Sequence, residues 1–156
     1  MDMLRRTILK GASASGMLTV ALAAGVLKPE QVLAATWNKS AFESKDLDAA
    51  LKSLGASAAT ESKDIVLKAP DIAENGAVVP VEVTSNIPNT SELSILVVMN
   101  PFPLSTTFNF SNGAVAEASV RLKLAQTSVV KVIAKADGKF YTAQKEVKVT
   151  VGGCGG

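Results

Sequence analysis

The sequence predicts a mainly β protein, an antiparallel β-sandwich of immunoglobulin-like type. Seven short apolar segments of strand character occur between residues 65 and 151, and turn signals separate most of them. The last segment, K-E-V-K-V-T-V, alternates apolar and polar side chains, as a sheet with one face on a core requires. The chain has a single cysteine, so the Cys-Trp-Cys framework of antibody domains is absent.

The individual strands have their own signals. Pro80 predicts that the second strand lies at a sheet edge or carries a bulge. The segment L-S-I-L-V-V-M is apolar almost throughout, which predicts a strand buried on both faces. Asp137-Gly138 predicts a hairpin turn. The predicted strands span residues 65–67, 76–84, 93–99, 106–110, 119–124 and 129–135, and a last strand ends at Val151.

An amphipathic helical segment is predicted at residues 36–55, before the sandwich domain of residues 56–151. Ser40 and Glu43 have the spacing of a capping box, and Gly55 stands where a helix usually ends. The segment either packs on the sandwich or binds a partner, and its residues leave both open. Its apolar positions recur at helical spacing: Phe42, Leu47, Ala50, Leu51 and Leu54.

The polar, small-residue stretch at residues 56–63 predicts a linker between the helical segment and the first strand.

Residues 1–35 are predicted to be an export signal outside the fold. A basic start is followed by an apolar run and by the small-residue stretch V-L-A-A-T, so we expect cleavage after Ala34 or Ala35. The pair Arg5-Arg6 resembles a twin-arginine signal, which predicts a periplasmic protein. The alternative is a retained membrane anchor, but a spanning helix needs roughly 20 apolar residues and this run is shorter. No membrane association is expected after cleavage.

Charge and composition exclude several classes of function. The leader carries four of the 16 basic and two of the 14 acidic side chains, so the mature chain has 12 of each. A near-neutral chain with few aromatic residues does not favour nucleic-acid binding. The chain has no histidine, which excludes His-ligated metals and Ser-His or Cys-His nucleophile pairs. We therefore expect no metal and no cofactor.

The only thiol of the chain, Cys154, lies near its C-terminus in the sequence G-G-C-G-G. Glycine permits nearly every backbone conformation, so residues 152–156 predict a flexible, thin arm formed by Gly152, Gly153, Gly155 and Gly156. If the last strand ends near Val151, the thiol stands about 10 Å beyond it. No neighbouring side chain activates Cys154, so it is suited to be acted upon by other proteins rather than to catalyse.

Three other interpretations of the terminal cysteine remain open on composition. It is incidental to a frayed terminus, or it joins two copies of a structural β-sandwich protein through an intermolecular disulfide. A Gly-Gly terminus also occurs in ubiquitin-like sulfur carriers that form a thiocarboxylate. That last chemistry needs cytoplasmic activation, and the export signal opposes it.

The leader, the predicted sandwich and the stretch K-E-V-K-V-T-V-G-G-C-G-G together resemble the SoxY family, the sulfur carriers of the periplasmic thiosulfate-oxidising Sox system. The segments A-D-G-K-F-Y and V-V-P-V-E-V-T-S-N extend the resemblance over the mature domain. The terminal motif is specific in combination with an export signal and much weaker alone.

The resemblance implies that Cys154 is the site of covalent substrate attachment in a carrier that is not itself an enzyme. A c-type cytochrome partner would couple thiosulfate to Cys154. A hydrolase would release sulfate, and a sulfane dehydrogenase, where present, would oxidise the remaining sulfur. The family works as a heterodimer with SoxZ, a second small β-sandwich. Trp37, Phe42 and the apolar strand at residues 93–99 are candidates for that interface.

Overall fold

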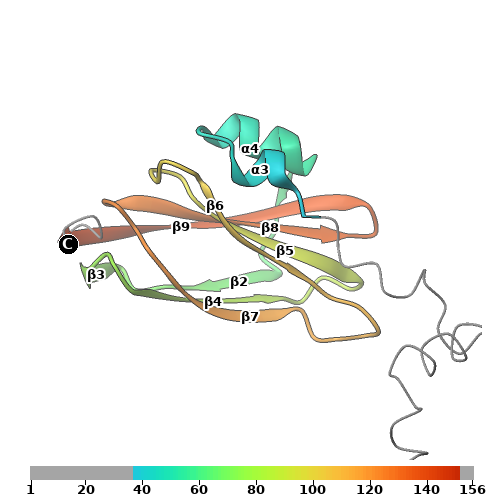
Figure 1. Ribbon diagram of the computed structural model, residues 1–156. Helices are drawn as coiled ribbons and strands as arrows, with labels where there is room; N and C mark the ends of the chain where they lie inside the picture. The colour runs from blue at the N-terminus through green and yellow to red at the C-terminus, as the bar shows by residue number, and fades with distance from the viewer. Residues whose placement is uncertain (1–36, 152–156) are drawn as a thin grey trace, which may run out of the picture. The chain divides into compact units, whose positions relative to one another are not determined.

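Two β-sheets face each other in the computed structural model, which describes residues 37–151 (Figure 1). The larger sheet has the strand order β1-β9-β8-β5-β6, and β3 also pairs with β9. The smaller sheet has the order β2-β4-β7. The strands are β1 Thr60–Glu61, β2 Ile65–Lys68, β3 Ile72–Asn75, β4 Val79–Ser85, β5 Thr90–Val97, β6 Leu104–Asn109, β7 Glu117–Leu122, β8 Ser128–Ala136 and β9 Lys139–Val151.

The predicted β-sandwich is confirmed, and so are the seven strands that the patterns indicated, with small shifts of their ends. Two further strands were missed. β1 lies inside the predicted linker, and β3 lies in a stretch too short to show an alternation of its own. Both run parallel to β9, whereas every other pairing among the described residues is antiparallel.

The main core lies between the two sheets. β4 alternates buried and exposed side chains, with Val79, Val81 and Val83 pointing inward. β5 differs because the five residues from Leu93 to Val97 are all fully buried, as the sequence predicted. The odd-numbered members of this run contribute to the core between the sheets, and Leu96 contributes to a second cluster on the opposite face.

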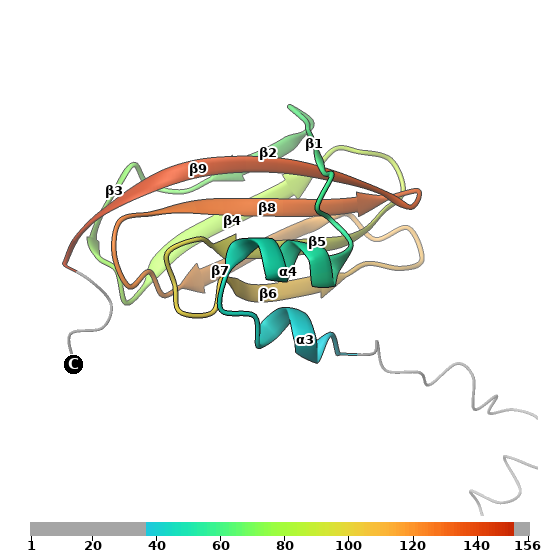
Figure 2. The same cartoon turned by 90° about the horizontal axis from the view of Figure 1, so that it is seen from above.

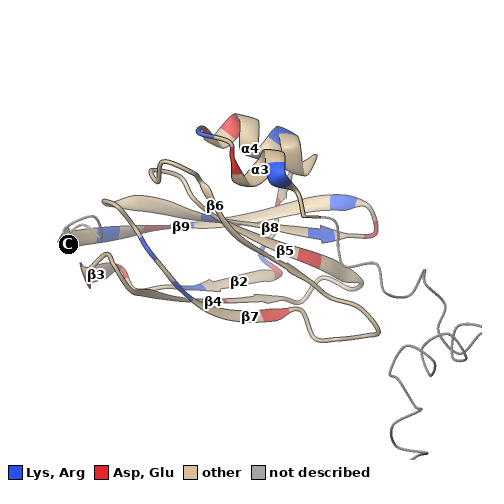
Figure 3. Cartoon of the chain, in the orientation of Figure 1, with Lys and Arg blue, Asp and Glu red and all other residues tan. Residues whose placement is uncertain are grey.

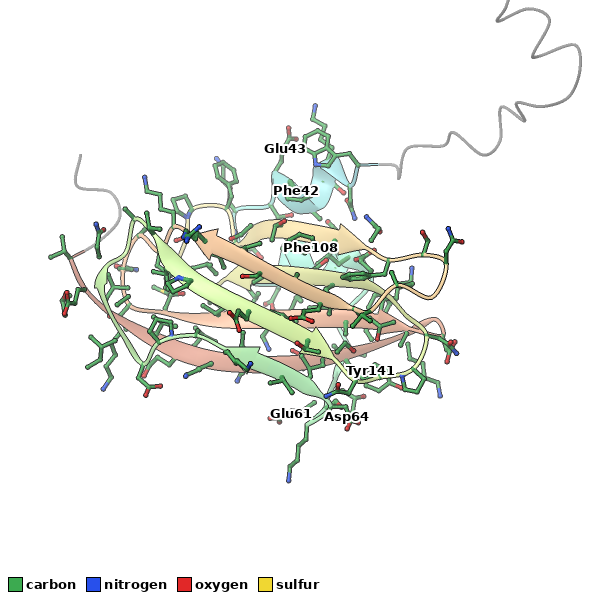
Figure 4. The ribbon with its side chains drawn as sticks, turned by 90° about the horizontal axis from the view of Figure 1, so that it is seen from below. Phe42, Glu43, Glu61, Asp64, Phe108 and Tyr141 are labelled. Carbon is green, nitrogen blue, oxygen red and sulfur yellow. The ribbon has the colours of Figure 1, made fainter. Side chains whose placement is uncertain are left out.

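Two short helices cover that opposite face of the larger sheet (Figure 2). They are α3 Lys39–Phe42 and α4 Leu47–Leu54, and their buried side chains contact Leu96, Leu104 and Ile133 of the sheet. Phe42 packs on this side, whereas Phe108 of β6 packs against the core between the sheets (Figure 4). The helical segment therefore packs on the sandwich.

The prediction of one continuous helix was wrong. Asn38 caps α3 by accepting a hydrogen bond from the Ala41 amide, and Asp46 caps α4 in the same way. The predicted cap residue, Ser40, instead lies within α3 and donates its hydroxyl to Asn38. Asp and Asn side chains compete for the backbone donors of a helix start, so a second cap divides the segment. Gly55 ends α4 with a left-handed φ of 74°, as predicted.

Pro80 is accommodated where β4 has a neighbour on one side only. It lies opposite Arg121 of β7, but β2 ends at Lys68, opposite Glu82. The strand is central in its sheet but is locally an edge at Pro80, which explains how a residue without an N–H is tolerated there.

Some of the residues that the sequence suggested for a partner interface are exposed, and others are buried within this chain. Trp37 is 62% exposed and its ring lies 5.8 Å from that of Phe42. The candidate strand 93–99 was wrong for its first five residues, since they are fully buried within this chain under the helices and between the sheets. Only Met99, at its end, is an exposed large side chain.

Candidate functional site at the end of the last strand

The predicted attachment residue Cys154 and the arm glycines Gly152, Gly153, Gly155 and Gly156 lie outside the described residues, as does the leader. The described chain ends at Val151, three residues before the thiol. What the structure defines is therefore the end of β9 at Val151 and the contacts that hold it.

β9 extends beyond β8, the strand that pairs with most of β9. Its hairpin partner β8 accompanies it from Lys139, opposite Ala136, to Val147, opposite Ser128. The four residues after Val147 have no partner in β8. They are paired on the other edge by β3, with Ile72, Ala73 and Asn75 opposite Lys148, Val149 and Val151. The β3 strand that the sequence did not predict thus holds the last residues before the thiol-bearing segment.

Hydrogen bonds connect the end of β9 to the residues just before and just after β3. The Lys148 amide donates to the Asp71 carbonyl at 2.9 Å, and the Gly76 amide donates to the Val151 carbonyl at 2.8 Å. The Thr150 hydroxyl donates to the Glu74 carbonyl at 2.9 Å. Each such bond contributes about 1 kcal/mol net. Together they fix the backbone up to the last described residue.

Lys145 of β9 contacts the residues just before β3. The Lys145 Nζ lies 2.9 Å from a carboxylate oxygen of Asp71 and donates to the Ala69 carbonyl at 2.5 Å. The Lys145 side chain is about one-third exposed, whereas that of Asp71 is 89% exposed. Solvent therefore screens the ion pair, and the hydrogen bond to Ala69 supplies the more directional contact.

Loops from elsewhere in the chain are tied to the same place. The Gly76 carbonyl accepts the Leu124 amide at 2.7 Å. Asn100 then joins the β5–β6 loop to the segment after β7, because its side chain donates to the Lys123 carbonyl at 2.7 Å and accepts from the Ala125 amide at 3.0 Å. Hydrogen bonds therefore connect the segments around Gly76, Asn100 and Leu124 to one another and to the end of β9.

The sequence identified the thiol, but it did not reveal the residues that hold the end of β9 and the loops beside it. These are the residues of β3, Lys145 and Asn100. A signal for β3 was present, since Pro70-Asp71 and Gly76 bound a stretch of strand length. Its four residues, I-A-E-N, were too few to show a period. Nothing local marked Lys145 or Asn100, because their partners are 76 and 23 to 25 residues distant in the sequence.

The described residues 37–151 show no grouping of ligating side chains fit to bind a metal ion. Over the same range, no helix is long and apolar enough to cross a membrane.

A hollow of about 410 Å³ lies at the end of the sandwich opposite Val151, between the β4–β5 and β6–β7 loops. It has no ionisable lining residue. The Ser85 and Thr90 hydroxyls, which line it, lie 2.8 Å apart, and Thr90 also donates to the Ile87 carbonyl at 2.7 Å. Without an ionisable residue, this lining offers no side chain for acid–base catalysis.

Comparison with known proteins agrees with this arrangement. Residues 50–154 match the model of a family described as the sulfur oxidation protein SoxY. The chain is also similar to the solved structure of the sulfur carrier protein SoxY from Chlorobium limicola f thiosulfatophilum, with 40% identity and a TM-score of 0.62. That match covers 68% of this chain and 97% of the other. No curated protein matches the chain.

A β-sandwich whose last strand leads to a single terminal thiol defines, with these matches, a sulfur carrier of sulfur oxidation. The chain belongs to the SoxY family. The sequence resemblance is thereby confirmed, together with the carrier role.

Proposed function

We propose that this SoxY-family chain holds thiosulfate-derived sulfur covalently on Cys154 and presents it to partner enzymes. The observation that carries the proposal is the anchoring of β9. The strand continues four residues past β8, is paired by β3 up to Val151, and stands three residues before the only thiol. A fixed base followed by a glycine-rich arm gives a thiol that moves while its origin stays constant.

The chemistry balances without a group supplied by this chain other than the thiol. Coupling removes two electrons and one proton from the Cys154 thiol and thiosulfate, and forms a sulfur–sulfur bond. A c-type cytochrome is the proposed electron acceptor. Water then attacks the terminal sulfonate sulfur, the sulfur–sulfur bond breaks, and sulfate leaves with a persulfide on Cys154. The chain is a carrier and not an enzyme in both steps, and it needs no cofactor.

The proposed partners follow from the family. They are a SoxZ-like subunit that forms a heterodimer with this chain, the coupling cytochrome, the sulfate-releasing hydrolase and, where present, a sulfane dehydrogenase. We further propose that residues 1–35 direct export through the twin-arginine pathway and that the mature chain works in the periplasm. The Arg5-Arg6 pair and the small-residue stretch before Trp37 support this location.

The decisive experiment compares the native protein with Cys154→Ser in the complete system. We expect native protein from thiosulfate-grown cells, measured by intact mass under non-reducing conditions, to carry one thiosulfate-derived or sulfane group per chain on the Cys154 peptide. Cys154→Ser should carry none and should abolish thiosulfate-dependent cytochrome reduction, with an unchanged circular dichroism spectrum and Tm.

Turnover that survives in the Ser variant would contradict the proposal. A native protein isolated entirely as a Cys154-linked disulfide dimer, without sulfur adducts, would instead establish the structural alternative. Non-reducing electrophoresis of the same sample distinguishes these results.

A further inference from the structure

Large exposed hydrophobic side chains are concentrated at one end of the sandwich. Among residues 37–151, eight large hydrophobic residues are exposed, and three of them, Trp37, Val66 and Val115, lie elsewhere. The other five lie on β3, at the end of β9 and in the loops beside them, and we call them the apolar rim. They are Ile72 (59% exposed), Val78 (55%), Met99 (52%), Phe102 (50%) and Val151 (61%).

The hydrogen bonds of this end hold the segments that carry the apolar rim together. Val151 is joined to Gly76, two residues before Val78, and Gly76 is joined to Leu124. Asn100, between Met99 and Phe102, is bonded to both neighbours of Leu124. Figure 1 shows the β5–β6 loop, β3 and the end of β9 at the same end of the sandwich. The apolar rim is therefore a set of exposed side chains on segments that are far apart in the sequence and meet at one end of the sandwich.

The composition of the apolar rim and its surroundings supports a role in binding. Exposed loops and strand ends usually carry polar side chains, so five large apolar ones at one end of the sandwich need a reason. Lys148, Lys123 and Glu74 are exposed near them, and Figure 3 shows charges of both signs around this end. An apolar centre with a polar, mixed-charge surround is the usual anatomy of a protein–protein contact.

The position of the thiol determines which partner must touch the apolar rim. Cys154 is three residues from Val151, so an extended chain reaches about 10 Å from the sandwich. An enzyme that encloses the thiol in its active site must bring the mouth of that site within this distance of Val151. Its surface around the mouth then lies against the residues that surround Val151.

We propose that the apolar rim is the docking surface for the enzymes that process sulfur on Cys154, and that each of them presents an apolar collar around a channel about 10 Å deep. This inference rests on the proposed function. A permanent subunit covering the same residues would obstruct that approach, so we assign the stable partner to another face. Five side chains make a small contact, below about 1,200 Å², as suits a carrier that must dissociate after each step.

The test measures steady-state turnover by the sulfate-releasing hydrolase of the system, with the full complex loaded with thiosulfate on Cys154 as substrate. The variant is Val78→Ser with Phe102→Ser. Because a contact residue at the centre of an interface is worth more than about 1 kcal/mol, we expect kcat/KM to fall at least tenfold, through KM, with kcat at saturation within about twofold. Val115→Ser, at the opposite end and 74% exposed, is the matched control and should leave kcat/KM unchanged.

Two readouts separate docking from damage to the carrier. The Tm of each variant and the rate at which a small aromatic disulfide reacts with Cys154 should equal those of the native complex. If the double variant does not fold, the single variants Met99→Gln and Phe102→Ser replace it, each with an expected rise in KM of at least threefold.

An unchanged kcat/KM in the rim variants overturns the proposal. So does a rim variant that changes the self-association of the chain or loses its stable partner subunit in size-exclusion chromatography, because the rim then serves a second copy or the subunit interface. Cys154→Ser keeps the two hypotheses apart. If that variant is inactive while rim variants are normal, only the docking surface fails. If Cys154→Ser still turns over, the proposed function fails.

Discussion

The two ends of β9 are held in different ways. At its start, Asp137 and Gly138 form a two-residue turn with φ values of 49° and 74°, and β8 pairs with β9 directly from that turn. At its end, β8 is no longer present, and β3 pairs with β9 in parallel from 76 residues away. One end is organised by adjacent residues and the other by a distant segment.

The difference extends to the surfaces around the two ends. The end near the turn has the hollow, whose lining mixes polar residues with apolar ones such as Phe110 and Val115. Asn89 there donates to the Asp137 carboxylate at 3.2 Å. The end near Val151 has the apolar rim. The end near the turn thus has one of the eight exposed large hydrophobic side chains of residues 37–151, Val115, whereas the end near Val151 has five of them.

The largest expected effect concerns the core beneath the Val151 end. Leu124 is fully buried and its amide is bonded to Gly76. Leu124→Ala should lower the free energy of unfolding by about 3 kcal/mol, because a buried cavity replaces the lost side-chain contacts. Urea unfolding followed by circular dichroism measures the change. Val115→Ala is the control and should change it by less than about 0.5 kcal/mol; similar values for both would mean that Leu124 is not a core residue.

The turn end is tested by Gly138→Ala. The left-handed φ of 74° disfavours a side chain, so we expect a loss of about 1–2 kcal/mol although no atom lies within 4 Å of the new Cβ. Gly113→Ala has nearly the same φ, 73°, and an equally open site, and serves as the control outside the hairpin. If the left-handed φ causes the loss, both variants should lower the free energy of unfolding by a similar amount. Amide hydrogen exchange near Val151, at the other end of β9, should not change in Gly138→Ala.

A smaller effect is expected from Lys145→Met, which keeps an apolar stem and removes the contacts with Asp71 and Ala69. We expect a loss of about 1 kcal/mol, with a component that decreases at high salt because Asp71 is exposed. Amide exchange at Lys148 should accelerate, while that at Thr142 should not. Lys68→Met removes an ion pair of 3.7 Å in which both partners are exposed, and should lose less than about 0.5 kcal/mol.

The smallest effect should come from Thr150→Val. It removes the exposed hydrogen bond to the Glu74 carbonyl and lowers the free energy of unfolding by about 0.5 kcal/mol. Faster exchange confined to the amides of Val151 and Gly76 would show that β3 holds the end of β9 locally. Equal acceleration along all of β9 would contradict the separate anchoring of its two ends.

The features that could be predicted from the sequence are those with local signals. The alternation in β4 and β9, the apolar run of β5 and the Asp137-Gly138 turn each lie within a few residues, so period and turn chemistry revealed them. The divided helix shows the limit of this reasoning. The apolar spacing of three or four residues holds only from Leu47 onward. Phe42 lies five residues before Leu47, and Asp46 caps a new helix between them.

The sequence alone places Cys154 among glycines near the C-terminus. The resemblance to the family could also be predicted, because it depends on the order of residues alone. How the last strand is held could not. β3 is four residues long, and its pairing with β9, the bonds of Asn100 and the contact of Lys145 all join residues distant in sequence. Only folding brings those segments together, and only folding gathers the five exposed apolar side chains of separate strands and loops at one end of the sandwich.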